Sequence, residues 1–395
     1  MESKKKIVYL LPGGLFNSGG MERATTIKAN YLAEVSGYDI SIVTTEQMER
    51  PVFYPLSGKV HLYHLDIGIH ENFGKESYLW KVISRYWKTK AYKKKLKTLL
   101  YEIKPDITVS TLGLDIGFIN QFKDGSLKIG ELHFPGNFRQ LMANKLSKDF
   151  LSNYVAKLRT HELKRKCAHL AHLVVLTQEE KTSWKQKDTV SVIPNPLPFY
   201  PEAQALLINK QAIAVGRLAY EKGFDMLVDA WQIVSEKHPG WKLNIFGDGT
   251  QKQDLLHKIA DKGLEGVIEI HQPVEDIQNH YLEHSLLIFS SRYLEALPMV
   301  LLEAMSCGLP LVAFDAPCGP KDIIKEGING FLIETGNRKE LAEKINFLIE
   351  SEDIRKLMGK EAKSAALNYR EDQVMEQWIC LFNELENENN CSIRD

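Results

Sequence analysis

The sequence predicts an α/β protein with two successive doubly wound domains, each built on a parallel sheet with helices on both faces. Short runs rich in β-branched residues alternate with longer helical patterns along the chain, and the most apolar runs are typical of buried parallel strands. The alternation stops in the proline-rich stretch 194–201 and then starts again. A length of 395 residues, 44% of them hydrophobic, is sufficient for two cores.

Each domain contains its own series of predicted strands. In the first domain they are 5–12, 38–45, 59–66, 106–113, 128–135, 172–177 and 190–194. In the second domain they are 211–218, 241–249, 267–274, 286–292, 310–316 and 330–335. Because prolines interrupt helices and strands, the linker is placed between domains 1–198 and 204–370. Ligands of such sheets bind at the carboxyl ends of the strands, so we expect an active site in the cleft between the domains.

Composition limits the class of protein. The net charge of −1 gives no general attraction to nucleic acid. The five cysteines form no CxxC pair, which indicates a reduced, cytoplasmic chain. No apolar stretch approaches the roughly twenty residues that cross a bilayer, so membrane contact is expected to be peripheral.

The most informative segment is EALPMVLLEAMSCG, which holds two glutamates eight positions apart, Glu295 and Glu303. Pro298 fits the first turn of a helix and Gly308 fits its C-terminal cap. Two glutamates at a chosen spacing are usually solvated, but the neighbours of Glu303 are apolar, so the helix is predicted to be buried and the carboxylate needs a partner or a ligand. The backbone N–H groups of the helix start can bind an anion; they belong to Leu297, Met299 and Val300. Hydroxyl acceptors beside a phosphate-binding helix end suit a nucleotide sugar.

A glycine-rich loop, PGGLFNSGGMER, follows the first predicted strand and leads into a helix near Met21. Gly19 and Gly20 at this junction permit close approach of the backbone to a phosphate or a sugar, although a flexible surface loop is the simpler interpretation. The spacing differs from the GxGxxG fingerprint, and the only acidic candidate near the second strand is Glu46. NAD binding is therefore disfavoured.

Corresponding loops of the second domain carry cations and further glycines. Arg217 and Lys222 lie between a predicted strand and a helix, where they can offset charge on a departing diphosphate. The alternative is a solvated basic loop with Glu221 as a partner. The segment IFGDGT places Gly247 in a tight turn, and the loop around Val274 can offer main-chain groups to a nucleotide base.

The second domain closely resembles glycosyltransferase family 4, retaining enzymes of the GT-B fold. The resemblance is carried by GRLAYEKG, IFGDG, the loop around Val274, SSRYLEALPMVLLEAMSCGLPLVAFDAPCGPKDII and GINGFLIE; it is weaker in the first domain. It implies that Glu295 contacts donor-sugar hydroxyls and that Glu303 contacts the ribose. It also implies that Arg217, Lys222 and the backbone over 297–300, which includes Pro298, bind the diphosphate. From the first domain, Gly19 and Gly20 would face the same phosphates. Many family members have glycine where Ala296 stands, which bears on sugar preference alone.

The resemblance extends to the catalytic chemistry and to the chain end. His133, at the end of the fifth strand, matches the family histidine that reaches the reacting sugar, although a lone histidine is more often a packing residue. It is expected to hydrogen-bond to the sugar while the leaving phosphate takes the acceptor's proton. No Asp-x-Asp occurs in the chain, so metal-independent transfer without a cofactor is expected. In this fold the terminal helix, 371–390, returns to the first domain, where Trp378 and Phe382 would anchor it.

The segment 78–101 is strongly basic and contains no acidic residue. Its cations are interleaved with aromatic residues, a composition that suits docking to an anionic membrane at about 1 kcal/mol for each charge near the surface. The predicted docking residues are Trp80, Arg85, Trp87, Lys88, Lys93, Lys94 and Lys95, together with the nearby aromatic residues Tyr86 and Tyr92. A solvated face that covers core aromatics is the alternative, and nucleic acid is disfavoured by the balanced charge.

The sequence therefore predicts a retaining hexosyltransferase that uses a nucleotide diphosphate sugar, with uridine diphosphate favoured by family analogy. The expected acceptor is a saccharide or a lipid-linked saccharide of a surface glycan, reached from the inner face of the cytoplasmic membrane. Two other classes stay open. A sugar-nucleotide epimerase would convert the nucleotide sugar without an acceptor, and a noncatalytic membrane-docking protein would not turn it over.

Overall fold

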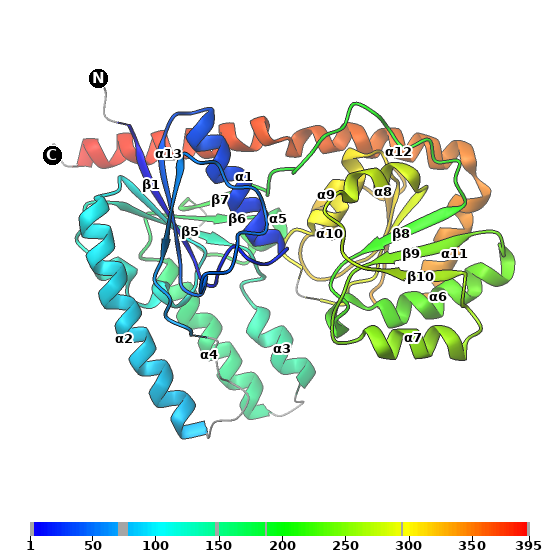
Figure 1. Ribbon diagram of the computed structural model, residues 1–395, viewed down its shortest axis with the longest axis horizontal. Helices are drawn as coiled ribbons and strands as arrows, with labels where there is room; N and C mark the ends of the chain where they lie inside the picture. The colour runs from blue at the N-terminus through cyan, green and yellow to red at the C-terminus, as the bar shows by residue number, and fades with distance from the viewer. Residues whose placement is uncertain (1–3, 70–77, 147–149, 186–187, 294, 393–395) are drawn as a thin grey trace. The chain divides into compact units, whose positions relative to one another are not determined.

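The computed structural model describes residues 4–69, 78–146, 150–185, 188–293 and 295–392. The chain forms two compact units (Figure 1). Unit 1 consists of Met1–Pro196 and Val374–Asp395, and unit 2 consists of Leu197–Gln373. The division falls within the proline-rich stretch, where fixed φ angles and missing N–H groups prevent a regular element from continuing.

Unit 1 contains a seven-stranded parallel sheet with the order β3-β2-β1-β4-β5-β6-β7. Its strands are β1 Lys6–Leu11, β2 Asp39–Thr44, β3 Val60–His64, β4 Ile107–Ser110, β5 Leu127–Leu132, β6 His172–Val175 and β7 Val190–Val192. Its helices are α1 Gly20–Glu34, α2 Tyr78–Ile103, η1 Leu114–Gly117, η2 Ile119–Gln121, α3 Phe138–Leu146, α4 Phe150–Cys167 and α5 Gln178–Thr182. The seven strands predicted for this half of the chain are confirmed.

Alternation along β1 shows how both faces of this sheet become buried. Ile7, Tyr9 and Leu11 pack with residues of α1 in one cluster, whereas Val8 and Leu10 pack with residues of α2 in another. Successive side chains of a strand point to opposite faces, so a strand covered on both sides is apolar throughout. This pattern explains why the uninterrupted apolar runs predicted the strands correctly.

The long C-terminal helix, α13 (Glu371–Ser392), packs on the same face of this sheet as α1. Trp378 and Phe382 are fully buried and their ring centroids lie 5.5 Å apart. The prediction that the terminal helix returns to the first sheet is therefore confirmed. The α13 side chains in the cluster are Val374, Met375, Trp378, Leu381, Phe382 and Leu385.

Unit 2 contains a six-stranded parallel sheet with the order β10-β9-β8-β11-β12-β13. Its strands are β8 Gln211–Val215, β9 Lys242–Phe246, β10 Ile268–His271, β11 Leu286–Phe289, β12 Leu311–Phe314 and β13 Gly330–Ile333. Its helices are η3 Tyr220–Lys222, α6 Phe224–Lys237, α7 Lys252–Asp261, α8 Ile277–Glu283, α9 Met299–Ser306, α10 Pro320–Ile323, α11 Arg338–Glu350, α12 Glu352–Ala366 and η4 Leu367–Tyr369. All six strands predicted for this half are confirmed.

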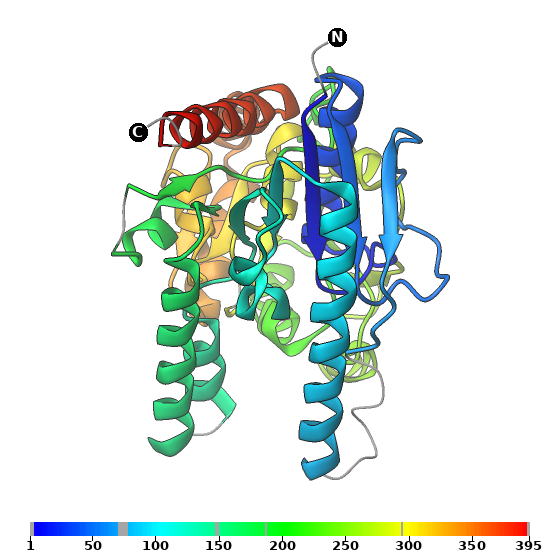
Figure 2. The same cartoon turned by 90° about the vertical axis from the view of Figure 1, so that its left-hand side faces the viewer.

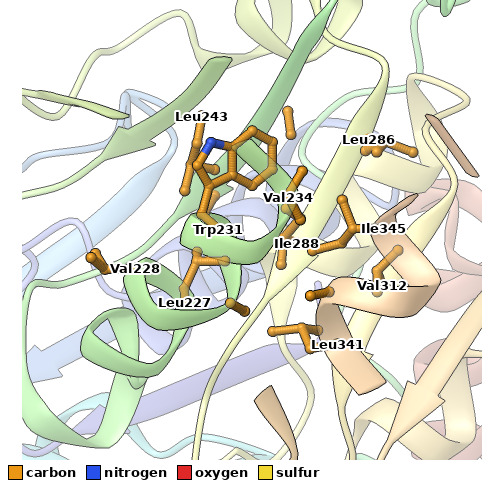
Figure 3. Packing of buried hydrophobic residues seen from close by; sticks show 14 of the residues in the cluster. Leu227, Val228, Trp231, Val234, Leu243, Leu286, Ile288, Val312, Leu341 and Ile345 are labelled. Atoms are coloured by element: carbon orange, nitrogen blue, oxygen red, sulfur yellow. The ribbon is translucent and has the colours of Figure 1, made fainter. Parts of the chain in front are cut away.

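One side of this second sheet is closed by α6 and α11, which pack around Trp231 (Figure 3). The Trp231 ring is fully buried beside Leu243 of β9 and Val234 of its own helix. Ile345 of α11 belongs to the same cluster. This packing fixes the strands whose carboxyl ends carry the polar residues of the candidate site.

Strand order reverses direction between β1 and β4 in unit 1 and between β8 and β11 in unit 2. In doubly wound sheets the loops that leave the carboxyl ends at such a point diverge and leave room for a ligand. Among the residues that the structure describes, no helix is long and apolar enough to span a membrane.

Candidate functional site

The loops that follow β8 and β11, the two strands at the reversal point of unit 2, meet through an ion pair. Lys222 Nζ lies 2.6 Å from Glu295 Oε1, and the Ser291 hydroxyl donates a 2.7 Å hydrogen bond to the same carboxylate oxygen. Glu295 is buried. A buried carboxylate needs such partners, and an ammonium group has three donors, so Lys222 retains capacity for an anionic ligand.

Backbone contacts hold these two loops together. Ser290 Oγ donates to the carbonyl of Lys222 at 2.9 Å. Arg292 donates from its backbone N–H to the Glu221 carbonyl at 2.8 Å and pairs through its guanidinium with Asp225 at 2.5 Å. Gly223 has a φ of 67°, and a Cβ at this position would lie 2.1 Å from the Ser290 carbonyl oxygen, so only glycine allows this approach. These backbone contacts therefore hold Lys222 and Glu295 next to each other.

Helix α9 starts at Met299, shortly after Glu295, and carries Glu303 on a buried face. Pro298 is the N-cap residue, and Gly308 follows the helix with a φ of 79°. Glu303 is 3% exposed, and its Oε2 accepts a 3.0 Å hydrogen bond from the hydroxyl of Tyr281 on α8. The predicted burial of Glu303 is confirmed, and Tyr281 is one partner of its carboxylate.

Arg217 lies differently from Lys222. Its side chain is 70% exposed and pairs with Glu221 at 2.7 Å. This is the arrangement expected of a solvated basic loop. Because exposed ion pairs contribute about 1 kcal/mol or less, Glu221 would not prevent Arg217 from moving to a phosphate.

The glycines of the β9 loop have a packing role. A Cβ at Gly247 would lie 2.0 Å from the Gly216 carbonyl oxygen, so this loop and the β8 loop approach too closely for a side chain. Beyond them the Phe246 ring stacks on His271, with centroids 4.7 Å apart. Val274 follows in an exposed loop. Phe246 is buried, but the His271 side chain is partly exposed, and an exposed ring face beside such a loop is chemically suited to a nucleotide base.

In unit 1, His133 follows β5 and contacts a buried carboxylate. Its Nε2 lies 3.0 Å from Glu131 Oε1, and its side chain is 5% exposed. The same Oε1 of Glu131 is hydrogen-bonded to Lys28 Nζ of α1. Both side chains of this Lys28–Glu131 pair are 1% exposed. Although burial alone raises it, the charges of Lys28 and of protonated His133, together with the hydrogen bond from Lys28, hold the pKa of Glu131 at about 2. Burial lowers the pKa of Lys28, and Glu131 opposes this effect.

The Gly19–Gly20 junction forms the start of α1, with Gly19 as the N-cap. A Cβ at Gly19 would lie 2.2 Å from Glu22 Oε2, so the Glu22 carboxylate folds back toward the helix start. Burial raises the pKa of Glu22, and the nearby His133 lowers it in part. The structure thus groups the glycine loop, Glu22 and His133 within unit 1.

Helix α2 displays aromatic residues to solvent in its N-terminal half. Trp80 and Trp87 are 55% and 59% exposed. The helix extends beyond the sheet, and α4 extends in the same direction (Figure 2). Tyr92 differs from the expectation for this segment, because it is buried against Phe118 with centroids 5.4 Å apart.

The cations of α2 also divide into two groups. Lys88 donates to the Gly68 carbonyl, Lys93 to Gln121 Oε1, and Lys95 to the Leu65 carbonyl. These three contacts attach the helix to its own unit, although Lys95 is exposed, as are Arg85 and Lys94.

Sequence reasoning missed the partners of the predicted residues. Lys28, Glu131 and Tyr281 were not selected, although a charged residue inside the apolar run KIGELHF is a visible signal for Glu131. Tyr281 and Lys28 have no comparable signal. Within the part of the chain that the structure describes, no group of three or more His, Cys, Asp or Glu residues is placed to hold a metal ion.

Comparisons with known proteins agree with this architecture. The chain has the GT-B fold and superimposes with a TM-score of 0.75 on a mutant of S. aureus TarM in complex with fondaparinux, alpha-GlcNAc-glycerol and UDP, at 17% identity over 96% of this chain and 100% of that one. Residues 203–365 match the model of the glycosyl transferases group 1 family.

Curated relatives match over nearly the whole length. An amylovoran biosynthesis glycosyltransferase of Erwinia amylovora is 30% identical over 95% of this chain and 99% of its own length. A Campylobacter jejuni GalNAc-alpha-(1->4)-GalNAc-alpha-(1->3)-diNAcBac-PP-undecaprenol alpha-1,4-N-acetyl-D-galactosaminyltransferase is 26% identical over 97% and 99%. Fold and sequence together define a glycosyltransferase. The chain belongs to the glycosyl transferases group 1 family, the family that the sequence motifs resembled.

The Lys28–Glu131 pair predicts a specific pH dependence of stability. The folded-state pKa of Glu131, about 2, lies below its ordinary value of 4.5, so its stabilisation is complete above pH 4.5 and is lost as the pH falls toward 2. The shift corresponds to about 3 kcal/mol. This loss of stability is measured by urea unfolding of the wild type and of the double variant Lys28→Met/Glu131→Gln as the pH is lowered from 5. The wild type should lose more stability than the variant, and parallel pH profiles would contradict the assignment.

Proposed function

We propose that this chain is a retaining, metal-independent hexosyltransferase. It transfers a glucose, galactose or N-acetylhexosamine residue from a UDP-sugar to a saccharide or lipid-linked saccharide acceptor in surface glycan biosynthesis. The observation that carries the proposal is the buried cluster in which Lys222 and Ser291 hold Glu295 beside the start of α9. It combines hydroxyl acceptors, a cation and helix N–H groups within one unit.

Each group of the cluster has a role in donor binding. Glu295 accepts hydrogen bonds from sugar hydroxyls, and Glu303 accepts from the ribose. Lys222 contacts the diphosphate with the donors that Glu295 does not use, and Arg217 joins it by leaving its exposed partner. The backbone around Pro298 at the start of α9 binds the phosphates, while the loops of Gly247 and Val274 border the base.

Unit 1 provides the groups that act on the donor sugar and its phosphates. The Gly19–Gly20 loop faces the donor phosphates, and His133 hydrogen-bonds to the sugar. In the transfer step the bond between the anomeric carbon and the phosphate oxygen breaks, and the acceptor hydroxyl attacks from the same face. The leaving phosphate takes the proton of that hydroxyl. Charge that develops on the diphosphate is offset by Lys222 and Arg217.

The relatives support the substrate class. The TarM structure contains UDP, and the Campylobacter relative is named for transfer to an undecaprenol-linked glycan. The exposed indoles and cations of α2 suit an acceptor that is held at an anionic membrane. In a parallel sheet the N-terminus of a helix follows the carboxyl end of its strand, so α2 after β3 and His133 after β5 lie at the same edge of the unit 1 sheet. The proposal places the protein on the inner face of the cytoplasmic membrane.

Incubation with a panel of UDP-, GDP- and ADP-sugars tests the reaction class. Slow hydrolysis that releases free UDP, unchanged by excess chelator, is expected, since the cations of the site replace a metal. An isomerised nucleotide sugar would instead identify an epimerase, and an unchanged panel would favour a noncatalytic protein. Loss of hydrolysis in chelator, restored by a divalent ion, would overturn metal independence.

Substitutions at Glu303 and His133 separate binding from turnover. Glu303→Ala should raise the Kd for UDP by about tenfold or more through loss of the ribose contact, and His133→Ala should lower kcat by about a hundredfold with little change in Kd. Calorimetry and the hydrolysis assay give the two quantities. Glu303→Gln keeps an acceptor for Tyr281 and controls for packing, and Glu343→Gln on the exposed face of α11 is the surface control. Equal, small effects at both positions would contradict the assigned roles.

Sedimentation with vesicles tests docking through α2. Wild-type protein should sediment with anionic vesicles at low salt and remain in solution with zwitterionic vesicles. Trp80→Ala/Trp87→Ala should weaken binding by about tenfold or more, because two indoles no longer enter the interface. The control, Leu206→Ala/Leu357→Ala, removes two exposed apolar side chains from unit 2. No sedimentation of the wild type, or equal losses in both variants, would end the membrane proposal.

A further inference from the structure

The buried ion pair of unit 1 lies next to the proposed reacting histidine, in a position that strand geometry dictates. Leu127 and Ile129 of β5 pack with the cluster formed by α1 and α13. Glu131 has the same parity as these residues and so points toward that face. His133 is the first residue after the strand, and its Nε2 lies 3.0 Å from Glu131 Oε1. A carboxylate two residues before the histidine therefore becomes its neighbour without any special turn.

The surroundings of Glu131 keep it charged. Lys28 approaches it from α1, and the Lys28 ammonium lies 4.9 Å from the ring centre of Trp378 on α13 and 5.5 Å from that of Tyr9 on β1. Aromatic faces attract cations, so the two rings favour a protonated lysine. With a full positive charge beside it, Glu131 stays ionised at neutral pH.

An ionised carboxylate is an acceptor only, and this determines which histidine nitrogen carries a proton. Glu131 Oε1 lies 3.0 Å from Nε2 of His133, so the favourable tautomer has its hydrogen on Nε2. The contact is short but poorly aligned. Among the described residues, His133 Nε2 and Glu131 Oε2 have no well-aligned hydrogen-bond partner. The 3.0 Å separation is within hydrogen-bonding range for an N–H that points at the carboxylate oxygen.

We propose that Glu131, held ionised by Lys28, is a positioning residue for His133: it fixes the imidazole with Nε2 protonated and turned inward, and so presents Nδ1 to the donor sugar. This inference rests on the proposed function and specifies how the histidine acts. Neutral Nδ1 accepts a hydrogen bond from a sugar hydroxyl. As positive charge develops on the sugar ring the hydroxyl becomes a better donor, so the bond strengthens in the transition state.

A purely structural role for the ion pair makes different predictions. If Lys28 and Glu131 only attach α1 to β5, a neutral pair of similar shape that folds normally will preserve both the histidine tautomer and turnover. The double variant Lys28→Met/Glu131→Gln provides this neutral pair and avoids leaving one charge buried alone, which is strongly destabilising. Tyr9→Phe is the matched control, because it changes a buried polar group on the same face and leaves both charges in place.

Nitrogen-15 NMR of histidine-labelled protein reads the tautomer without any substrate. The His133 signals are assigned by their disappearance in His133→Gln, and circular dichroism confirms that each variant is folded. Wild type and Tyr9→Phe should show His133 with the proton on Nε2, whereas the double variant should show a mixture of both tautomers. A proton on Nδ1 in the wild type, or an unchanged tautomer in the folded double variant, would overturn the proposal.

Kinetics provide the second measurement. In the donor-hydrolysis assay the double variant should lose at least about tenfold in kcat with KM for the donor changed by less than about threefold. Wild-type kcat in the folded double variant would leave the enzyme assignment intact and remove the role of Glu131. If no nucleotide sugar is turned over by the wild type, the proposed function fails, and the NMR result still decides whether Glu131 sets the tautomer.

Discussion

The order of parallel strands is the constraint on which the candidate site depends. In unit 2, β8 and β11 are neighbours in the sheet but are separated by two further strands in sequence. Their carboxyl ends therefore bring together loops about seventy residues apart, and the Lys222–Glu295 ion pair closes that junction. Gly223 allows these two loops to approach closely, and Gly247 does the same for the loops after β8 and β9. The chemistry of the site is thus a consequence of topology, since a different strand order would separate its groups along the edge formed by the carboxyl ends.

The same principle operates in unit 1 with a different result. Here β1 and β4 form the reversal point, and β5 is the next strand. The polar groups that gather near it come from the end of β5 and from α1. They are Glu22, Lys28, Glu131 and His133. The helix α13, the last element of the chain, covers this cluster through Trp378. A segment distant in sequence therefore contributes to the electrostatic surroundings of the histidine.

The separation of interacting residues along the chain determines which parts of the structure could be predicted from the sequence. All thirteen strands, the buried helix α9 and the return of the terminal helix could be predicted, because apolar runs, caps and family motifs are local signals. The partners of the predicted residues could not. Lys28 and Glu131 are 103 positions apart, and no local pattern indicates that two such charges will meet inside a core. The exposure of side chains could not be predicted either. Arg217 and Lys222 are similar in the sequence, but Arg217 faces solvent beside Glu221, whereas Lys222 is paired with Glu295. Tyr92 was expected at an interface because it lies among lysines, but its helical phase turns it toward Phe118.

The buried Lys28–Glu131 pair joins a helix to a sheet at a large cost in desolvation free energy. Removing two charges from water costs several kcal/mol for each ion, and apolar residues of the same volume are often neutral or stabilising replacements. The surrounding cluster of leucine, isoleucine and aromatic side chains would accommodate such residues. Stability alone therefore gives little reason for a charged pair at this position. The contact with His133 supplies one, because an apolar side chain at 131 would leave Nε2 facing hydrocarbon and both tautomers nearly equivalent. Lys28 then has a distinct role, because it keeps ionised a carboxylate that burial would otherwise neutralise, and only the ionised form is an acceptor without a proton of its own to donate to Nε2.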